Sequence, residues 1–438
     1  MKKPSQIIFT VLMFAVGLLV FGSTQILAAT TRTVDNGTID CPAATFTSIQ
    51  AAVTASAPGD TVQVCAGIYP EQVVIRIPLT VIGISANNHS RPEVRPPAGG
   101  LVVNTTRPFG APEAAMVLVD TPVPSGDVNI FNITVNGLGN VPIDTAGIYY
   151  RNAGGTILNN AVKNVRNANP GTTISGGILV GNSDGTTSTQ TSVLNNVVVD
   201  YEKFGILAQR DGTFVTVGGN YIFGLGFDSA PNFPTNPGIA QNGIEIGFGA
   251  NGNINNNRVS NNIYRGCTPT TQCAGSIVIY DVAPSTTPLL VELNNISKSN
   301  VGIISQGASG GFRTTNGATY RLNFIHKTEL GDGMDIEGNN NTILENKILN
   351  TDGTAIQLLS GSTGNSITNN VINDAAIGIA RVDSGNTQSN NTFINVDQNV
   401  SPAPPAPFRP QNARSRSTVI DKKPITNSAS SFRISPTQ

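Results

Sequence analysis

Two short elements recur near the C-terminal end of this chain at a nearly fixed period. The first is an Asn that begins a short apolar run, in steps of 23, 24 and 21 residues, at Asn323, Asn346, Asn370 and Asn391. The second is a small residue followed by Ile or Met, found at Gly302-Ile303, Gly333-Met334, Ala355-Ile356 and Gly378-Ile379. Self-similarity at this period, with strand-like alternation, indicates a solenoid with one coil per repeat.

Both elements continue toward the N-terminus with uneven steps. The small-plus-apolar element occurs at Gly147-Ile148, Gly177-Ile178, Gly205-Ile206 and Gly243-Ile244. The Asn element occurs at Asn160, Asn196, Asn220, Asn257 and Asn295. A coil of about 22 residues, lengthened in places by a loop of about 14, explains these steps. We expect the surface loops at 184–190, 225–241, 265–274, 283–288 and 307–318.

A coil of this length accommodates about three strands, with neighbouring coils about 4.8 Å apart. The aliphatic residues predicted to stack inside are Ile148, Ile178, Ile206, Ile244, Ile303, Met334, Ile356 and Ile379. The repeated Asn suits a corner, because it tolerates left-handed backbone and its amide can bond an identical amide one coil away.

The segment before the coils is expected to cap the open end of the solenoid. Residues 48–53 have helical spacing, with Ser48 or Thr47 as the N-cap, and Pro58-Gly59 ends that helix. Strands are expected at 61–65, 72–75 and 79–82. A terminal helix would cover backbone and core that an open coil end leaves exposed.

These features resemble the right-handed parallel β-helix superfamily, often called pectin-lyase-like. The stretches 48–53, 58–62 and 66–71 are similar to the opening of many members, and the resemblance covers residues 40–400. It implies an all-β right-handed parallel β-helix solenoid with three strands per coil, a short N-terminal capping helix and surface loop insertions. It does not specify activity, because members include lyases, esterases, hydrolases, epimerases and non-catalytic surface proteins.

Four regions are expected along the chain. Residues 1–29, with Lys2, Lys3 and an apolar stretch before Ala28, have the features of a signal peptide, the alternative being an uncleaved anchor. Residues 30–100 form the N-terminal cap and first coils, and 101–400 the parallel β-helix. Residues 401–438 are a Pro-rich, basic, flexible tail that could alternatively bind a polyanion. No later segment is apolar enough to be transmembrane, so we expect a secreted, extracellular or periplasmic protein.

The charge of the chain limits the partners that we expect, and its cysteine content predicts disulfides. A net charge of −1 with 12% charged residues argues against nucleic acid. The resemblance implies a polysaccharide or cell-surface glycan as the partner, and the oligomeric state stays open. The four cysteines of an exported chain favour disulfides, which we expect as Cys41–Cys65 and Cys267–Cys273. A metal site is the alternative, although no His lies near either pair.

The densest acidic segment of the chain is residues 331–337. Met334 and Ile336 should point inward, which places Asp335 and Glu337 on the outer side of one strand. One coil later Gln357 should lie beside Asp335, and one coil earlier Gln306 should lie near Glu337. Asp332 and Asp352 should occupy the turns that enter these strands.

Three roles are open for this patch. Paired carboxylates can divide acid and base duties in glycoside cleavage, which makes Asp335, Glu337, Asp332 and Asp352 catalytic candidates. No cofactor is required, but Asp335 and Glu337 could hold Ca²⁺ against a uronate substrate. The carboxylates could also only keep a sheet face soluble. Gln357, Gln306 and Tyr149 are the substrate-binding candidates.

Other motifs argue against two standard enzymes and provide one candidate base for a lyase. Asn350-Thr351-Asp352-Gly353 matches a polygalacturonase motif, but Ala375 follows Asp374 where that family has a second Asp, and the motifs of pectin methylesterases are missing. Neither standard enzyme is expected. A polysaccharide lyase needs a base, for which Arg210 is the candidate. Aromatic residues near the 225–241 insertion either pin that loop or wall a sugar-binding groove; they are Tyr221, Phe223, Phe227 and Phe233.

Three functions therefore remain. The first is an exported β-helix protein that binds or acts on an acidic polysaccharide, as a lyase or glycoside hydrolase if it is an enzyme. The second is a non-catalytic surface or matrix binding protein. The third, a periplasmic metal-handling helper, is weakened by a content of four Met and two His.

Overall fold

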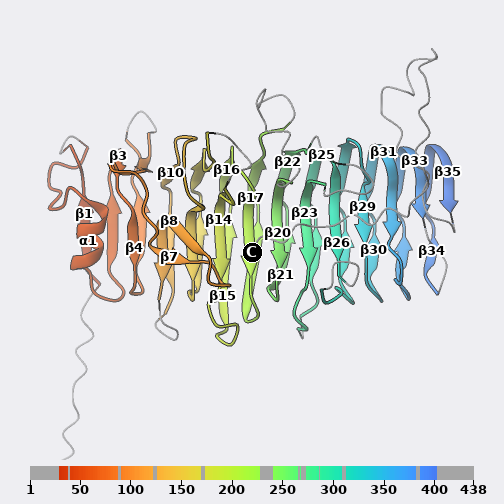
Figure 1. Cartoon of the computed structure of the whole chain (residues 1–438), viewed down its shortest axis with the longest axis horizontal. Helices are drawn as coiled ribbons and strands as arrows, with labels where there is room; N and C mark the ends of the chain where they lie inside the picture. Colours follow the sequence, from red (N-terminus) through yellow and green to blue (C-terminus); the bar gives the residue numbers. More distant parts are fainter. Residues whose placement is uncertain are drawn as a thin grey trace, which may run out of the picture.

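The computed structural model describes residues 29–37, 40–86, 90–121, 126–168, 173–226, 240–264, 267, 273–285, 287–307, 312–380 and 385–401. The expected signal segment up to residue 28, and the tail from residue 402, lie outside these residues and stay predictions. The described chain winds as a long stack of coils, with the N-terminal cap at one end and β35 at the other (Figure 1). Each coil contributes to three parallel faces.

Face 1 is a 13-stranded sheet. Its strands are β1 (Thr31–Val34), β2 (Thr61–Val64), β5 (Thr80–Gly83), β9 (Val128–Phe131), β12 (Gly155–Leu158), β15 (Thr189–Leu194), β18 (Thr213–Gly218), β21 (Asn251–Asn255), β24 (Leu290–Glu292), β27 (Thr319–Arg321), β30 (Thr342–Leu344), β32 (Ser366–Thr368) and β34 (Thr387–Ser389).

Faces 2 and 3 join at the C-terminal end into one 22-stranded sheet. Face 2 comprises β3 (Gly67–Pro70), β6 (Pro92–Arg95), β10 (Thr134–Asn136), β13 (Ala161–Lys163), β16 (Val197–Val199), β19 (Tyr221–Phe223), β22 (Arg258–Asn262), β25 (Asn295–Ser299) and β28 (Phe324–Thr328). Face 3 comprises β4 (Val73–Ile75), β8 (Pro112–Asp120), β11 (Thr145–Arg151), β14 (Gly176–Gly181), β17 (Phe204–Gln209), β20 (Asn242–Gly247), β23 (Gly275–Tyr280), β26 (Val301–Gln306) and β29 (Met334–Ile336). The long strands β31 (Lys347–Leu358), β33 (Val371–Ala380) and β35 (Thr392–Ser401) bend around the corner and serve both faces. A short strand, β7 (Thr105–Thr106), pairs antiparallel with β8.

The predicted aliphatic column lies inside the coils. Consecutive strands of face 3 pair in register through Ile148, Ile178, Ile206, Ile244, Ile277, Ile303, Met334, Ile356 and Ile379. All are fully buried in one continuous core. Ile277 completes the column in a coil that the repeat pattern does not assign, because Ser276 replaces the usual Gly before it.

The corner between faces 1 and 2 is an amide ladder. Asn196 shows the pattern: its Nδ2 donates to Asn220 Oδ1 (3.0 Å) and to Ile157 O (2.9 Å). In the fifth predicted coil the ladder residue is Asn294, which bonds Asn323 at 3.0 Å, so the assignment to Asn295 is wrong by one residue. The left-handed conformation belongs to the preceding residue, which is Asn195 (φ 53°) in one coil and Leu322 (φ 55°) in another. Two adjacent residues therefore perform the two roles that we predicted for one Asn: the first adopts the left-handed conformation and the second forms the amide ladder.

The N-terminal cap is a single helix of about two turns, α1 (Ile49–Ala55), with Ser48 as its N-cap. Glu71 accepts hydrogen bonds from Ser48 Oγ and Ile49 N, both at 2.8 Å, and from Gln50 N at 2.9 Å. The carboxylate satisfies backbone donors that a helix start leaves unpaired.

Both expected disulfides, Cys41–Cys65 and Cys267–Cys273, are present. Among the described residues no helix is long and apolar enough to cross a membrane.

Candidate functional site

The acidic segment lies on face 3, at β29. Met334 and Ile336 point into the core, so Asp335 is on the outward side of the strand, as predicted. In the register of the sheet Asp335 lies between Ile304 on β26 and Gln357 on β31. Glu337 follows the end of β29, and its backbone N donates to Ser305 O (2.7 Å), beside Gln306. The structure therefore brings together the predicted pairs Asp335–Gln357 and Glu337–Gln306.

Backbone amides hold the other carboxylates of this cluster. Asp332 Oδ1 accepts a hydrogen bond from Thr354 N (2.6 Å), and Asp352 Oδ2 accepts one from Leu330 N (3.0 Å). Glu337 Oε2 accepts one from Gly307 N (2.8 Å). We call Asp332, Asp335, Glu337 and Asp352, with Gln306 and Gln357, the acidic cluster.

The acidic cluster is buried, so the expectation of an exposed surface patch is wrong. Asp335 is 0% exposed and Glu337 is 3% exposed. On the outer side of face 3, Tyr264, Cys267 and Cys273 pack in a second apolar cluster that includes Leu330 and Ile304, the register neighbour of Asp335. Periodicity alone does not reveal this cluster.

Burial and proximity change the acidity of two of these carboxyls. Burial, and then the adjacent carboxyl of Asp332, raise the pKa of Asp335 well above its usual value. Burial likewise raises the pKa of Asp332 above its usual value, although the hydrogen bonds from Asp335 and from Thr354 N act in the opposite direction. Among the described residues, neither Asp335 oxygen receives a hydrogen bond from an N–H or hydroxyl donor.

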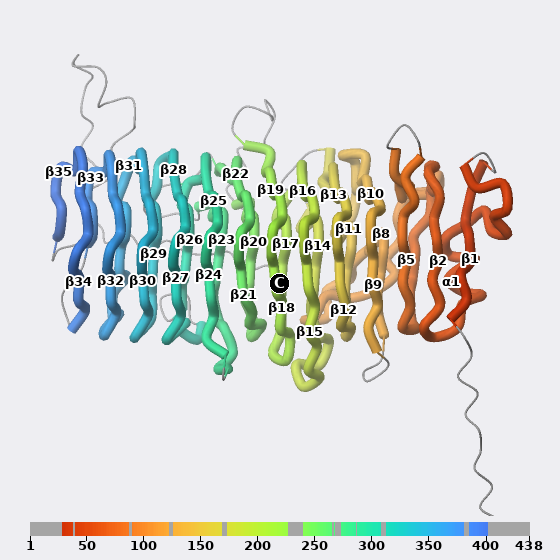
Figure 2. The backbone as a smooth tube through the Cα atoms, turned by 180° about the vertical axis from the view of Figure 1, so that it is seen from behind, coloured from red at the N-terminus to blue at the C-terminus, as the bar shows by residue number. Residues whose placement is uncertain are grey.

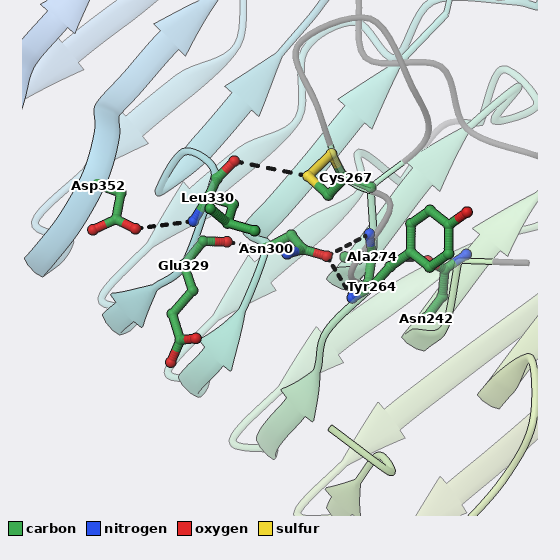
Figure 3. Close-up of a disulfide and its surroundings, with 10 residues drawn as sticks. Asn242, Tyr264, Cys267, Ala274, Asn300, Glu329, Leu330 and Asp352 are labelled. Carbon is green, nitrogen blue, oxygen red and sulfur yellow. Dashed lines mark hydrogen bonds between the residues drawn. A yellow bond between two sulfur atoms is a disulfide. The ribbon is translucent and has the colours of Figure 1, made fainter. Parts of the chain in front are cut away.

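The Cys267–Cys273 disulfide is connected to the acidic cluster (Figure 3). Cys267 Sγ lies 3.7 Å from Leu330 O, and Leu330 N donates to Asp352. Asn300 Oδ1 accepts hydrogen bonds from Tyr264 N (2.7 Å) and Ala274 N (3.2 Å), which fixes the two ends of the disulfide loop on the sheet. Cys267 therefore contacts the residue whose backbone N donates to Asp352.

The structure separates Arg210 and Tyr149 from the acidic cluster. Arg210 follows β17, four strand steps from β29, or about 19 Å along the axis. Its guanidinium carbon lies 4.7 Å from the centre of the Phe109 ring. Tyr149 lies still nearer the N-terminus, fully buried, with its hydroxyl donating to Thr106 O (3.2 Å). A single site cannot contain Asp335 together with either residue.

One buried carboxylate on the same outward column was not found from the sequence. Glu245 on β20 accepts hydrogen bonds from Tyr280 Oη (2.6 Å) and from Asn242 Nδ2 (2.8 Å). The signal that could have identified it is Gly243-Ile244-Glu245, which has the same alternation as Gly333-Met334-Asp335. Phe227 and Phe233, two of the predicted loop aromatics, lie outside the described residues.

The donor set does not fit a metal ion. Within the described ranges no three Asp, Glu, His or Cys side chains group closely enough to hold one. We therefore assign no step of the reaction to Ca²⁺.

No protein-family model matches the chain, and no curated protein matches it in sequence. Its structure is similar to that of the GH136 lacto-N-biosidase from Eubacterium ramulus, with a TM-score of 0.54 and 12% identity over 83% of this chain and 67% of that chain. The family 28 exopolygalacturonase of Yersinia enterocolitica gives 0.49 and 12% identity over 85% of this chain and 77% of the other. The surface adhesin PfbA of Streptococcus pneumoniae gives 0.41 and 15% identity, over 81% and 88%. The parallel three-faced stack and the similarity to the lacto-N-biosidase show that the chain has the right-handed parallel β-helix fold.

Proposed function

We propose that this protein is an exported β-helix protein that binds and cleaves a polysaccharide at the acidic cluster. The observation that carries the proposal is Asp335, a buried carboxyl on a regular strand whose pKa is raised by burial and by Asp332. A carboxyl that remains neutral near neutral pH can protonate the oxygen of a glycosidic bond. The similar structure of the lacto-N-biosidase supports a carbohydrate substrate at the level of the fold only. Two disulfides support export to an oxidising compartment.

The reaction assigned to the cluster is glycoside hydrolysis with Asp335 as the acid and Glu337 as the base. Asp335 gives its proton to the leaving oxygen as the bond to the anomeric carbon breaks. Glu337 takes a proton from the water whose oxygen forms the new bond to that carbon.

Gln306 and Gln357 flank this pair on adjacent coils and are assigned to substrate hydroxyl groups. Gln357 Oε1 is buried without a hydrogen-bond donor in the present state. Buried acceptors of this kind are rare in folded proteins, and a sugar hydroxyl would satisfy this one. Because Asp335 is fully buried, cleavage requires that the cover around Tyr264 and the disulfide move aside.

A non-catalytic binding protein is the second candidate, and the closed state of the acidic cluster is the observation that favours it. A screen of uronate-containing and neutral polysaccharides, with Ca²⁺ or with a chelator, distinguishes the hydrolase from the non-catalytic binding protein. New reducing ends indicate hydrolysis, and ultraviolet absorbance of unsaturated products indicates lyase chemistry instead.

The variants that test the assignment are Asp335→Asn and Glu337→Gln. Each should lower turnover by about a hundredfold or more. The matched control is Glu345→Gln, which removes an exposed carboxylate on the same coil. If no polysaccharide is cleaved, or if Asp335→Asn is fully active, the hydrolase proposal is wrong.

A further inference from the structure

A second, exposed set of side chains runs along the outward side of face 2. Strands β19, β22, β25, β28 and β31 follow one another along the axis of the solenoid (Figure 2). Their outward residues, which we call the face 2 platform, are Tyr221, Phe223, Arg258, Ser260, Asn295, Ser297, Phe324, His326, Lys347 and Leu349. None of these residues belongs to the acidic cluster, which lies on face 3.

The platform contains two pairs of stacked rings, each beside a cation. The rings of Tyr221 and Phe223 are 6.2 Å apart and nearly parallel, and those of Phe324 and His326 are 4.7 Å apart. The guanidinium carbon of Arg258 lies 5.4 Å from the centre of the Tyr221 ring. Lys347 Nζ lies 5.6 Å from the centre of the Phe324 ring. The four ring residues are half-buried and both cations are exposed, so the platform presents aromatic and charged groups together.

The platform is positively charged. It contains no Asp or Glu, and the exposed residues Lys298 and Lys327 flank it on the corner toward face 3. Among the described residues, none of the ion pairs involves Arg258, Lys298, Lys327 or Lys347. Partial burial, and then the charges of Lys327 and Arg258, lower the pKa of His326. This local field contrasts with the net charge of −1 of the whole chain.

The spacing of the platform suits an extended sugar chain. Neighbouring strands are about 4.8 Å apart, which is close to the length of one pyranose residue in an extended polysaccharide. The two ring pairs, on β19 and β28, are three strand steps or about 14 Å apart, with Arg258 and Asn295 on the strands between them. Sugar rings stack on aromatic faces, and uronate carboxylates pair with Arg and Lys.

We propose that the face 2 platform binds an extended, uronate-containing polysaccharide that lies along the axis of the solenoid. The Tyr221–Phe223 and Phe324–His326 pairs stack on two of its rings, and Arg258 and Lys347 bind its carboxylates. The proposal rests on the proposed polysaccharide function, but it assigns the acidic substrate to a face other than that of the acidic cluster. It also explains how a protein whose reactive groups are carboxyls can hold an anionic chain.

The test measures the affinity of the full chain for polygalacturonate and alginate by affinity electrophoresis. Tyr221→Ala combined with Phe324→Ala should weaken binding about tenfold. Arg258→Gln combined with Lys347→Gln should weaken it at low salt and reduce its salt dependence. The matched control combines Phe214→Ala with Arg321→Gln, which removes a half-buried ring and a cation from the outward side of face 1. That control should bind like the unmodified protein.

Two results would overturn the platform proposal. One is unchanged affinity in both platform variants. The other is equal retention by polyglutamate, which would indicate a general ion-exchange surface without sugar recognition. The Asp335→Asn variant separates this proposal from the hydrolase proposal, because it should keep full affinity and lose cleavage. Normal binding by the platform variants contradicts only the platform, whereas cleavage by Asp335→Asn contradicts only the hydrolase.

Discussion

Faces 2 and 3 are built by the same strand alternation, but their outward side chains have opposite environments. On face 3, Phe204 and Asp335 are fully buried, whereas on face 2, Phe324 is half-buried and Lys347 is exposed. The difference comes from what lies over each face. The segment with Thr106 contacts the N-terminal part of face 3, and the disulfide loop packs on its C-terminal part. The covered face of the solenoid therefore contains buried carboxyls with shifted pKa values, and the uncovered face presents rings and cations to solvent.

The largest expected difference between the faces is in the stability effect of removing an aromatic ring. Phe204→Ala on face 3 should lower the free energy of unfolding by about 3–5 kcal/mol, because it leaves a cavity under the cover. Phe324→Ala on face 2 should lower it by less than about 1 kcal/mol. Chemical denaturation of the two variants measures both values. Equal losses would mean that the two faces are covered alike.

Removing the disulfides should reveal how much each constrains the chain. Cys41 and Cys65 are separated by 24 residues and Cys267 and Cys273 by 6. Loop-closure entropy predicts losses of about 3.5 kcal/mol for the first pair and about 2.4 kcal/mol for the second when both cysteines become Ser. The second variant should also slow cleavage, because Cys267 contacts Leu330, whose backbone N donates to Asp352. Faster cleavage would show that this disulfide limits access to the acidic cluster.

The acidic cluster should make stability depend on pH. The folded pKa of Asp335 lies above the unfolded value of about 3.9, so the folded state binds more protons. Its stabilising contribution is present below the unfolded pKa and is lost as pH rises toward the folded pKa, at up to about 1.4 kcal/mol per pH unit. Asp335→Asn should flatten this slope in denaturation measured across pH. Lys347→Gln on face 2 is the control and should leave the slope unchanged.

The smallest stability effect is expected for the platform cations. Arg258→Gln and Lys347→Gln should change the free energy of unfolding by less than about 0.5 kcal/mol, because both side chains are exposed and form no ion pair with a described residue. Thermal unfolding at low and high salt checks this value. A loss of more than 2 kcal/mol would show that these side chains hold face 2 together, and their effect on binding would then be indirect.

The interior of the molecule could be predicted from the sequence, and the cover of face 3 could not. The recurring small-plus-apolar element places Ile303, Met334 and Ile356 in one column, because each coil repeats the geometry of the last even where a loop lengthens it. The same period predicts that Asp335 points outward beside Gln357. The full burial of Asp335 has no such signal, because the period gives the direction of a side chain and not what lies over it. Where two asparagines adjoin, at Asn294 and Asn295, the pattern alone does not say which one bonds the ladder.

The most direct test of the account is the protonation state of Asp335 at neutral pH, measured by infrared spectroscopy of the carboxyl stretch. The account predicts a protonated-carboxyl band in the unmodified protein that is lost in Asp335→Asn and retained in Glu345→Gln. A spectrum in which every carboxyl is already ionised at neutral pH would contradict it, because the acid that the proposed hydrolysis requires would then be missing.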